Sequence, residues 1–363
     1  MVASPAAPLS PSERIARWRL IRTERIGPLS MVALVERHGS AEAAIRALAD
    51  DPRAPPIAEG ATVAAESRRL EALGAWAMVW GDPDYPPALA AIADPPIVLS
   101  GLGRRELLAR PAVAIVGARN ASGAGRRFAE TVAAELGAAG FVVVSGMARG
   151  IDAAAHRGAL ATGTAGVLAT GIDVAYPNEN RELHAAVGGE GLLLAESLPG
   201  TGPRAENFPR RNRIVAGLAL GVVVIEAAER SGSLITARLA AEQGREVFAV
   251  PGSPLDPRCK GTNGLIRNGA QLTESAADVI EVLRPQAAPP RRRGPAAGTL
   301  PEPPDAPGDP AGRVLEQLGP TPLSVDELVR QCQLSQAAVA AVLLELELAG
   351  RIERHPGQKV SLR

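Results

Sequence analysis

The chain has 363 residues, enough for one large core and smaller modules, and its composition already excludes several classes of protein. Lys plus Arg and Asp plus Glu each number 39, so a basic coat that binds nucleic acid over the whole surface is excluded. The two cysteines, Cys259 and Cys332, and the four histidines lack the spacing of a disulfide framework or a metal site, so we expect no metal ion. No apolar stretch has the length of a membrane span, and we expect a cytoplasmic protein with no membrane partner.

Residues 1–74 are predicted to form a small helical module. Apolar residues recur at helical spacing from residue 12 to residue 48. An Ile-Gly-Pro turn at residues 26–28 interrupts the first helix, and Ser40 is a suitable N-cap for the last one. The turn is reminiscent of helix-hairpin-helix nucleic-acid modules, but we favour a module that only packs against its neighbours.

Residues 75–283 are predicted to form an α/β core. Its first part, residues 75–110, is expected to be an irregular connection with one short edge strand at residues 95–99. Six apolar, β-branched runs are then expected to be strands: residues 113–116, 141–145, 165–170, 192–196, 221–225 and 246–250. The intervening stretches with helical spacing are residues 122–136, 151–160, 180–187, 210–218 and 233–243. Apolar strands that alternate with helices indicate a parallel sheet covered on both faces, with ligands bound at the carboxyl ends of the strands.

The last part of the chain is predicted to be a linker followed by a separate domain. Residues 284–311 consist mainly of Pro, Ala, Gly and charged residues, which is typical of a flexible linker. Residues 312–363 show three helices and a two-stranded ribbon, and Ser324 begins a capping box, so this unit resembles a winged helix. The third helix, residues 335–349, has no Arg or Lys, and we therefore favour a protein contact over a contact with the DNA major groove.

The segment at residues 207–217 has the most distinctive composition in the chain. Arg210, Arg211 and Arg213 lie within about one helical turn of Phe208, and Asn212 lies among them. Pro209 suits the first position of a helix, whose N-terminus favours an anion. Guanidinium groups and a stacking ring suit phosphates and bases. A solvated basic helix start is equally compatible with the spacing alone.

Other loops of the predicted sheet add possible phosphate contacts. The loop at residues 117–125 follows a strand and opens a helix, but its glycines match neither GxGxxG nor the P-loop, so we expect no nucleotide cofactor. It is expected to form a backbone anion cradle from which Arg119 projects. Tyr176, in a later loop, is a candidate wall or stacking surface. These loops predict a groove for single-stranded nucleic acid, and its further residues are Gly117, Gly146, Arg149, Gly232 and Ser233.

Two other functions stay open from the residues alone. Asp152 and His156 lie four residues apart on one helix face and could form an acid/base pair, but no nucleophile accompanies them and we favour a structural role. With Glu226 they could serve a nucleotide or phosphoribosyl hydrolase, which would release free base from nucleoside monophosphates. A sequence-specific regulator acting through the C-terminal unit would instead bind duplex DNA.

Six motifs occur in order between residues 117 and 253: Gly-Ala-Arg, Ser-Gly-Met-Ala-Arg-Gly-Ile-Asp-Ala-Ala-Ala-His, Gly-Ile-Asp-Val-Ala-Tyr-Pro, Phe-Pro-Arg-Arg-Asn-Arg-Ile-Val-Ala-Gly, Gly-Ser-Leu-Ile-Thr-Ala and Val-Pro-Gly-Ser. Together they are highly specific, and the chain resembles the bacterial DNA-processing protein A family (DprA, also called Smf) over roughly residues 80–283. The N-terminal module, which is SAM- or helix-hairpin-helix-like, and the winged-helix-like unit resemble accessory domains of that family.

The resemblance implies an extended Rossmann-like domain that binds and protects incoming single-stranded DNA. It implies a homodimer, a partnership with the RecA recombinase, which the protein helps to load during natural transformation, and no enzymatic activity. By position, Arg119 and residues 208–213 would contact the strand, and Gly146, Arg149 and the Gly232-Ser233 pair would shape the pocket. One departure is Ala205, where many members carry a lysine, and Arg204 and Arg210 are the candidates to supply the missing charge.

Overall fold

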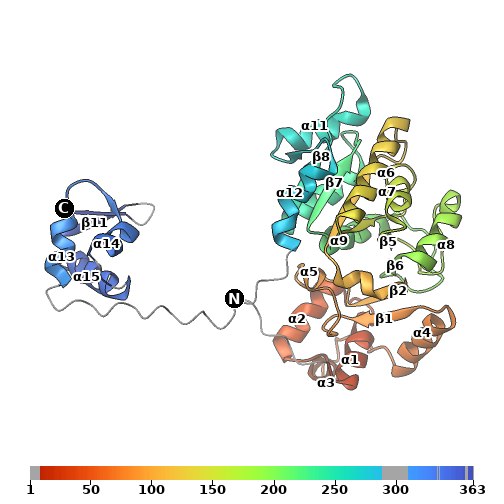
Figure 1. Ribbon diagram of the computed structural model, residues 1–363. Helices are drawn as coiled ribbons and strands as arrows, with labels where there is room; N and C mark the ends of the chain where they lie inside the picture. Colours follow the sequence, from red (N-terminus) through yellow and green to blue (C-terminus); the bar gives the residue numbers. More distant parts are fainter. Residues whose placement is uncertain (1–8, 288–309, 333, 335, 356–358, 363) are drawn as a thin grey trace. The chain divides into compact units, whose positions relative to one another are not determined.

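The computed structural model describes residues 9–287, 310–332, 334, 336–355 and 359–362 (Figure 1). These residues fall into two compact units that divide between residues 288 and 289, and each unit is described by itself. Among the described residues, none of the helices combines the length and the apolar character needed to cross a membrane.

The first unit begins with the predicted helical module. Its helices are α1 (Pro11–Ile21), α2 (Pro28–His38), α3 (Ala41–Ala49) and α4 (Gly60–Ala72), of which α4 was not predicted. Ser40 caps α3 as predicted, because its side chain accepts a hydrogen bond from the Ala43 N–H at 3.1 Å. The Glu66 carboxylate of α4 accepts hydrogen bonds from the Trp18 indole at 2.9 Å and the Arg22 guanidinium at 2.6 Å. Buried polar pairs therefore hold α1 against α4.

A mixed sheet forms the centre of the first unit. Its strands are β1 (Trp76–Val79), β2 (Val98–Gly103), β3 (Ala112–Gly117), β4 (Val142–Ser145), β5 (Thr164–Leu168), β6 (Leu192–Ala195), β7 (Gly221–Ile225), β8 (Glu246–Ala249) and β9 (Gln271–Leu272). Within the described residues the sheet has nine strands in the order β1-β2-β6-β5-β4-β3-β7-β8-β9. All neighbours from β6 to β9 are parallel. The six predicted core strands are confirmed, and their ends shift by no more than two residues.

The predicted irregular connection at residues 75–110 was wrong. It contains β1 and β2, which pair antiparallel, and β2 also pairs antiparallel with β6. The strand expected at the sheet edge is therefore an interior strand, and Ser100 lies opposite Ala195. This pairing could not be predicted from the sequence, because β1 has only four residues and the β2 residues opposite them lie 19 to 25 positions away along the chain.

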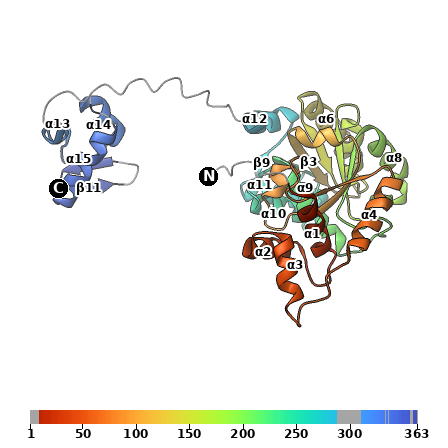
Figure 2. The same ribbon diagram turned by 90° about the horizontal axis from the view of Figure 1, so that it is seen from below.

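Helices cover both faces of the sheet, as predicted (Figures 1 and 2). One face packs against α9 (Asn207–Leu218) and α10 (Gly232–Glu242), and its core includes Val222 and Val224 of β7. The opposite face packs against α6 (Gly123–Ala138), α7 (Ile151–Ala159) and α12 (Ala276–Ala287). The core on that side includes Val223 and Ile225 of β7. Successive β7 residues thus enter opposite layers, which is why each strand reads as a continuous apolar run. The other α-helices described in this unit are α5 (Pro87–Ala90), α8 (Arg181–Glu190) and α11 (Lys260–Arg267), and its 3-10 helices are η1 (Arg105–Ala109), η2 (Asn178–Asn180) and η3 (Pro257–Cys259).

Helix α9 starts earlier than predicted. It begins at Asn207 rather than residue 210, so Pro209 is its third residue and not its first. The first four N–H groups of a helix have no partner within it, so the missing N–H of Pro209 still leaves no intrahelical bond unmade. The consequence is that Phe208 and Arg211 both belong to the first two turns of the helix.

The second unit is the predicted winged-helix domain. Its elements are α13 (Pro310–Gln317), β10 (Leu323–Ser324), α14 (Val325–Cys332), α15 (Gln336–Leu348), β11 (Ile352–His355) and β12 (Lys359–Leu362), with strand order β10-β12-β11. Val314, Leu328, Val339 and Val360 are among its fully buried core residues. The Ser324 hydroxyl accepts the Glu327 N–H at 3.2 Å, as the capping box predicted. Of the predicted linker, residues 284–287 belong to α12, residues 310–311 belong to α13, and residues 288–309 lie outside the described residues.

Candidate functional site

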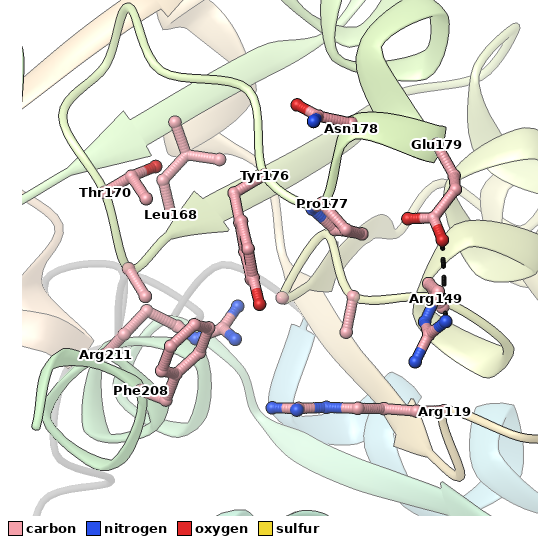
Figure 3. A pocket seen from close by; sticks show the side chains of 13 residues that line it. Arg119, Arg149, Leu168, Thr170, Tyr176, Pro177, Asn178, Glu179, Phe208 and Arg211 are labelled. Carbon is pink, nitrogen blue, oxygen red and sulfur yellow. Dashed lines mark hydrogen bonds and ion pairs between the residues drawn. The ribbon is translucent and has the colours of Figure 1, made fainter. Parts of the chain in front are cut away.

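The loops at the carboxyl ends of the parallel strands surround two adjoining hollows. The strand order reverses between β3 and β7, which makes this edge the topological switch point of the sheet. The first hollow, here called the aromatic pocket, has a volume of about 390 Å³ (Figure 3). It is lined by Arg119, Gly146, Ala148, Arg149, Leu168, Ala169, Thr170, Tyr176, Pro177, Asn178, Glu179, Phe208 and Arg211.

Two aromatic rings and a guanidinium group form the centre of the aromatic pocket. The ring centroids of Tyr176 and Phe208 lie 5.7 Å apart at an interplanar angle of 57°. The guanidinium carbon of Arg119 lies 5.4 Å from the Phe208 centroid, and Figure 3 shows its side chain extending below both rings. Tyr176 is 42% exposed, so its ring faces the open pocket. The aromatic rings thus offer a flat surface on which a base can stack, and the adjacent Arg119 guanidinium can bind a phosphate of the same strand.

Arg211 forms the inner wall of the same pocket. It is only 6% exposed, and its Nη1 donates a hydrogen bond to the Val167 carbonyl oxygen at 2.7 Å. Burial lowers the pKa of Arg211 to about 10, which the nearby Asp152 carboxylate opposes and the Arg119 charge reinforces. The side chain therefore remains a cation at neutral pH, and it is held in place before any ligand arrives.

The second hollow, here called the switch pocket, lies between the loops that follow β3 and β7 and has a volume of about 540 Å³. It shares Arg119, Gly146, Ala148, Phe208 and Arg211 with the aromatic pocket. The other residues used below are Gly117, Asn212, Arg230, Gly232, Ser233 and Arg258. The Ser231 hydroxyl accepts the Ser233 N–H at 3.4 Å and begins α10 there. Cationic side chains and a helix N-terminus thus face one continuous crevice.

The structure brings together most of the residues predicted to form the site. Those that line the two pockets are Gly117, Arg119, Gly146, Arg149, Phe208, Arg211, Asn212, Gly232 and Ser233. Arg149 is exposed and pairs with the exposed Glu179 at 3.5 Å. Arg210 is exposed outside both pockets, in a third hollow that also contains Arg204 and the Gly27-Pro28 turn.

Arg213 does not lie in either pocket. It is only 5% exposed, and its guanidinium pairs with Glu196 at 2.6 Å and with Asp94 at 3.1 Å. The helical spacing turns this side chain towards the sheet, where two carboxylates neutralise its charge. Arg213 therefore has a structural role, contrary to our expectation from the sequence, and we leave it out of the binding set.

The expected backbone anion cradle in the loop after β3 is occupied by the protein itself. Glu226 accepts a hydrogen bond from the Ser122 N–H at 2.8 Å, and the Ser122 hydroxyl bonds the other carboxylate oxygen. The N-terminus of α6 therefore already holds a negative charge. Gly117 and the exposed Arg119 remain in this loop as the expected contacts for a ligand.

The acid/base candidates also have structural partners. Asp152 accepts the N–H groups of Gly146 at 3.1 Å and Ala148 at 3.3 Å, and burial raises its pKa against the opposing effect of the Arg211 charge. The Nδ1 atom of His156 lies 2.7 Å from the Thr164 hydroxyl, and burial lowers the pKa of His156 to about 3. The structural role that we favoured for both residues accounts for these contacts.

Sequence reasoning missed two cations of the switch pocket. Arg230 lies in the loop before Ser231, and Arg258 lies in a short 3-10 helix, Pro257–Cys259, after β8. Arg230 could have been found from the sequence, because it lies three residues before the predicted start of the helix at residues 233–243. Arg258 could not, since only the position of its short helix beside the switch point brings it to the crevice.

The fold and the crevice together define a class of protein. Its members have an α/β core with a cationic and aromatic ligand-binding crevice at the switch point of the sheet. The same chain also carries a helical module and a winged-helix module. The family model described as DNA recombination-mediator protein A matches residues 76–284. The model of the DprA winged helix domain matches residues 298–358, and that of the DprA-like N-terminal HHH domain matches residues 11–68. The chain belongs to the DNA recombination-mediator protein A (DprA/Smf) family.

Individual relatives agree with this assignment. Protein Smf of Synechocystis is 37% identical over 313 residues, which is 78% of this chain and 79% of the relative. DNA processing protein DprA of Streptococcus pneumoniae is 47% identical over 201 residues, which is 55% of this chain and 71% of the relative. The resemblance seen in the six motifs is thereby confirmed.

Solved structures show the same fold. The X-ray structure of DprA from Streptococcus pneumoniae superposes with a TM-score of 0.65 at 33% identity, covering 76% of this chain and 98% of that one. A structure of DNA processing protein A from Helicobacter pylori, described by its single-stranded DNA binding mode, gives a TM-score of 0.53 at 32% identity and covers 56% of this chain and 94% of that one.

The match at residues 11–68 also supports the helix-hairpin-helix interpretation of the Ile-Gly-Pro turn.

Proposed function

We propose that this protein binds single-stranded DNA in the aromatic and switch pockets and acts there as a recombination mediator. The observation that carries the proposal is that the Phe208 ring lies close to both the Tyr176 ring and the Arg119 guanidinium, next to the buried Arg211. The family description and the single-stranded DNA binding of the Helicobacter pylori relative support it.

In this proposal, phosphates and bases are bound by different groups. Arg119, Arg230 and the N-terminus of α10 contact phosphates, while the Phe208 ring stacks on a base. None of these contacts reads base edges, so binding tolerates any sequence. Because the net charge of the chain is zero, the attraction is confined to the crevice and weakens steeply with salt.

The direct test is fluorescence anisotropy with labelled single-stranded and duplex oligonucleotides across a salt series. We expect tight, sequence-tolerant binding to the single strand with a steep salt dependence. Arg119→Ala is expected to weaken binding to all sequences alike. A sharp sequence preference, or stronger binding to duplex, would overturn the proposal.

We further propose that the protein has no catalytic activity of its own. The groups that a nucleotide or phosphoribosyl hydrolase would use are engaged in structural contacts: Asp152 with the loop after β4, His156 with Thr164, and Glu226 with Ser122. Incubation with nucleoside monophosphates should therefore release no free base. Release that is abolished by Asp152→Asn would favour the hydrolase instead.

The partners that we propose are a second copy of the chain and the RecA recombinase, both in the cytoplasm where incoming strands are recombined. Membership of a recombination-mediator family supports the recombinase. Light scattering of the purified full chain tests the dimer. The rate at which RecA assembles on coated single strands, with and without this protein, tests loading.

For the winged-helix domain we propose a protein contact. Among the described side chains of α15, Leu344 is 54% exposed and Glu345 is exposed, and the helix sequence contains no cation to meet a phosphate. Truncation after Arg284 should leave single-stranded DNA binding intact. Loss of duplex binding on this truncation would favour a sequence-specific regulator.

A further inference from the structure

The carboxylate of Glu226 lies at the start of α6, on the opposite side of the switch point from its own strand. Glu226 directly follows β7, and its backbone adopts a φ of 52°. One oxygen accepts the Ser122 N–H at 2.8 Å, and the Ser122 hydroxyl bonds the other. In doubly wound α/β sheets, a phosphate often binds at the N-terminus of the helix that follows a strand at the switch point. Here that helix is α6, which follows β3.

The surroundings are shaped to hold this carboxylate. The Gly125 N–H donates to the Ser122 hydroxyl oxygen at 2.8 Å, and that hydroxyl in turn donates to Glu226. A Cβ atom on Gly125 would lie 2.6 Å from the carboxylate carbon of Glu226. The glycine therefore leaves room that the carboxylate fills. The positive φ of Glu226 is a conformation that non-glycine residues seldom adopt, and the carboxylate contacts hold it there.

The loop after the neighbouring strand repeats the arrangement. There the Asp152 carboxylate accepts the N–H groups of Gly146 and Ala148, as described above. Backbone N–H groups at two adjacent strand ends are thus satisfied by carboxylates of the protein rather than left for an anion. The groups that still face the crevice are the N-terminus of α10 and cationic side chains, among them Arg119, Arg211 and Arg230.

We propose that Glu226 is a specificity-determining residue whose carboxylate occupies the phosphate position at the N-terminus of α6. This position therefore rejects inorganic phosphate and the phosphate group of a nucleoside phosphate. A nucleoside phosphate bound here would need the backbone N–H groups at the start of α6, and the Ser122 N–H already donates to Glu226 while the Gly125 N–H donates to the Ser122 hydroxyl. A DNA strand presents phosphates in a row, so it can use the separate side-chain cations instead.

The test uses Glu226→Gly in the full chain, because glycine accepts the positive φ while the carboxylate is removed. Thermal unfolding is followed in chloride and in phosphate, and in chloride with AMP, all at equal ionic strength. The melting temperature of wild type should rise less in phosphate or AMP than that of the variant. For a newly opened site with a Kd of about 1 mM, the variant should melt about 3 °C higher in about 10 mM phosphate.

Glu226→Gln is the matched control. Its amide still fills the position and can still accept one hydrogen bond from Ser122, so its melting temperature should respond to phosphate no more than that of wild type. If Glu226→Gly is unfolded in chloride, phosphate should restore its folding, as judged by circular dichroism.

A Glu226→Gly protein that ignores phosphate, or that phosphate fails to refold, would overturn the proposal and leave Glu226 as a simple helix cap. An equal response of Glu226→Gln would also overturn it, since the position would still be filled. No DNA enters these measurements, so their outcome is independent of whether the crevice binds single strands.

Discussion

The guanidinium group of Arg211 lies directly over the backbone of Gly146. A Cβ atom on that glycine would lie 2.0 Å from Nη1 of Arg211, far inside van der Waals contact. Arg211 leaves α9 and crosses towards the end of β4, where it reaches the Val167 carbonyl of β5. Because Gly146 has no side chain, the guanidinium group of Arg211 can occupy the space above it.

Gly146→Ala should therefore displace Arg211 although the arginine itself is unchanged. We expect a loss of about 1–3 kcal/mol in the free energy of unfolding, the usual cost of overpacking a buried site. Affinity for single-stranded DNA should fall as well. Chemical denaturation and anisotropy measure the two effects. Gly189→Ala is the control, because a Cβ atom at Gly189 meets nothing within 4 Å, and it should change neither quantity by much.

Phe208 allows stacking to be separated from charge. Phe208→Ala should weaken single-stranded DNA binding by about 1–3 kcal/mol, the usual contribution of one stacked base. The salt dependence should stay as in wild type, since no cation is removed. Phe208→Tyr keeps the ring and should bind nearly as well. If the alanine and tyrosine variants bind equally, Phe208 does not stack on a base.

Ala205 offers a gain of affinity. The residue is exposed, just before α9, where many family members carry a lysine. Ala205→Lys should strengthen single-stranded DNA binding and steepen the slope of log affinity against log salt by about 0.7, the value for one added phosphate contact. Ala205→Gln, of similar length and no charge, is the control. An unchanged slope would indicate that Arg204 or Arg210 already supplies this contact.

Arg210 and Arg213 lie three residues apart on α9 and should behave in opposite ways. Arg213→Ala leaves Glu196 and Asp94 without their partner, and we expect a loss of about 3–5 kcal/mol in unfolding free energy. Arg210→Ala removes an exposed side chain, so stability should stay within about 0.5 kcal/mol while DNA affinity falls. Denaturant melts of both variants, followed by anisotropy of the folded ones, test this division. Equal stabilities would contradict it.

The sequence was most informative where function and local structure depend on neighbouring residues. The loop after β3, the loop after β4 and the start of α9 were all recognised from glycines, arginines and strand–helix order, because parallel strands bring their carboxyl ends to one edge. The burial of Arg213 was not visible, since it depends on Asp94 and Glu196 from distant segments. The occupation of the α6 N-terminus by Glu226 was hidden for the same reason, because 104 residues separate Glu226 from Ser122.

His156 predicts how stability depends on pH. Its folded pKa of about 3 lies below the ordinary value of 6.5, because burial disfavours the charged ring. Between these values the unfolded chain binds a proton that the folded chain does not, so stability is complete above pH 6.5 and falls as the pH drops towards 3. The contribution is about 1.4 kcal/mol per pH unit at most.

His156→Asn isolates this contribution, because asparagine keeps a polar group near the Thr164 hydroxyl but does not titrate. We expect the variant to be less stable than wild type at pH 7, since it leaves part of the buried volume empty. Its stability should fall less steeply from pH 6 to pH 4, although His184, whose pKa burial also lowers, keeps some slope in both proteins. Denaturant melts at several pH values give both profiles, and parallel profiles would show that His156 does not stay neutral in the folded protein.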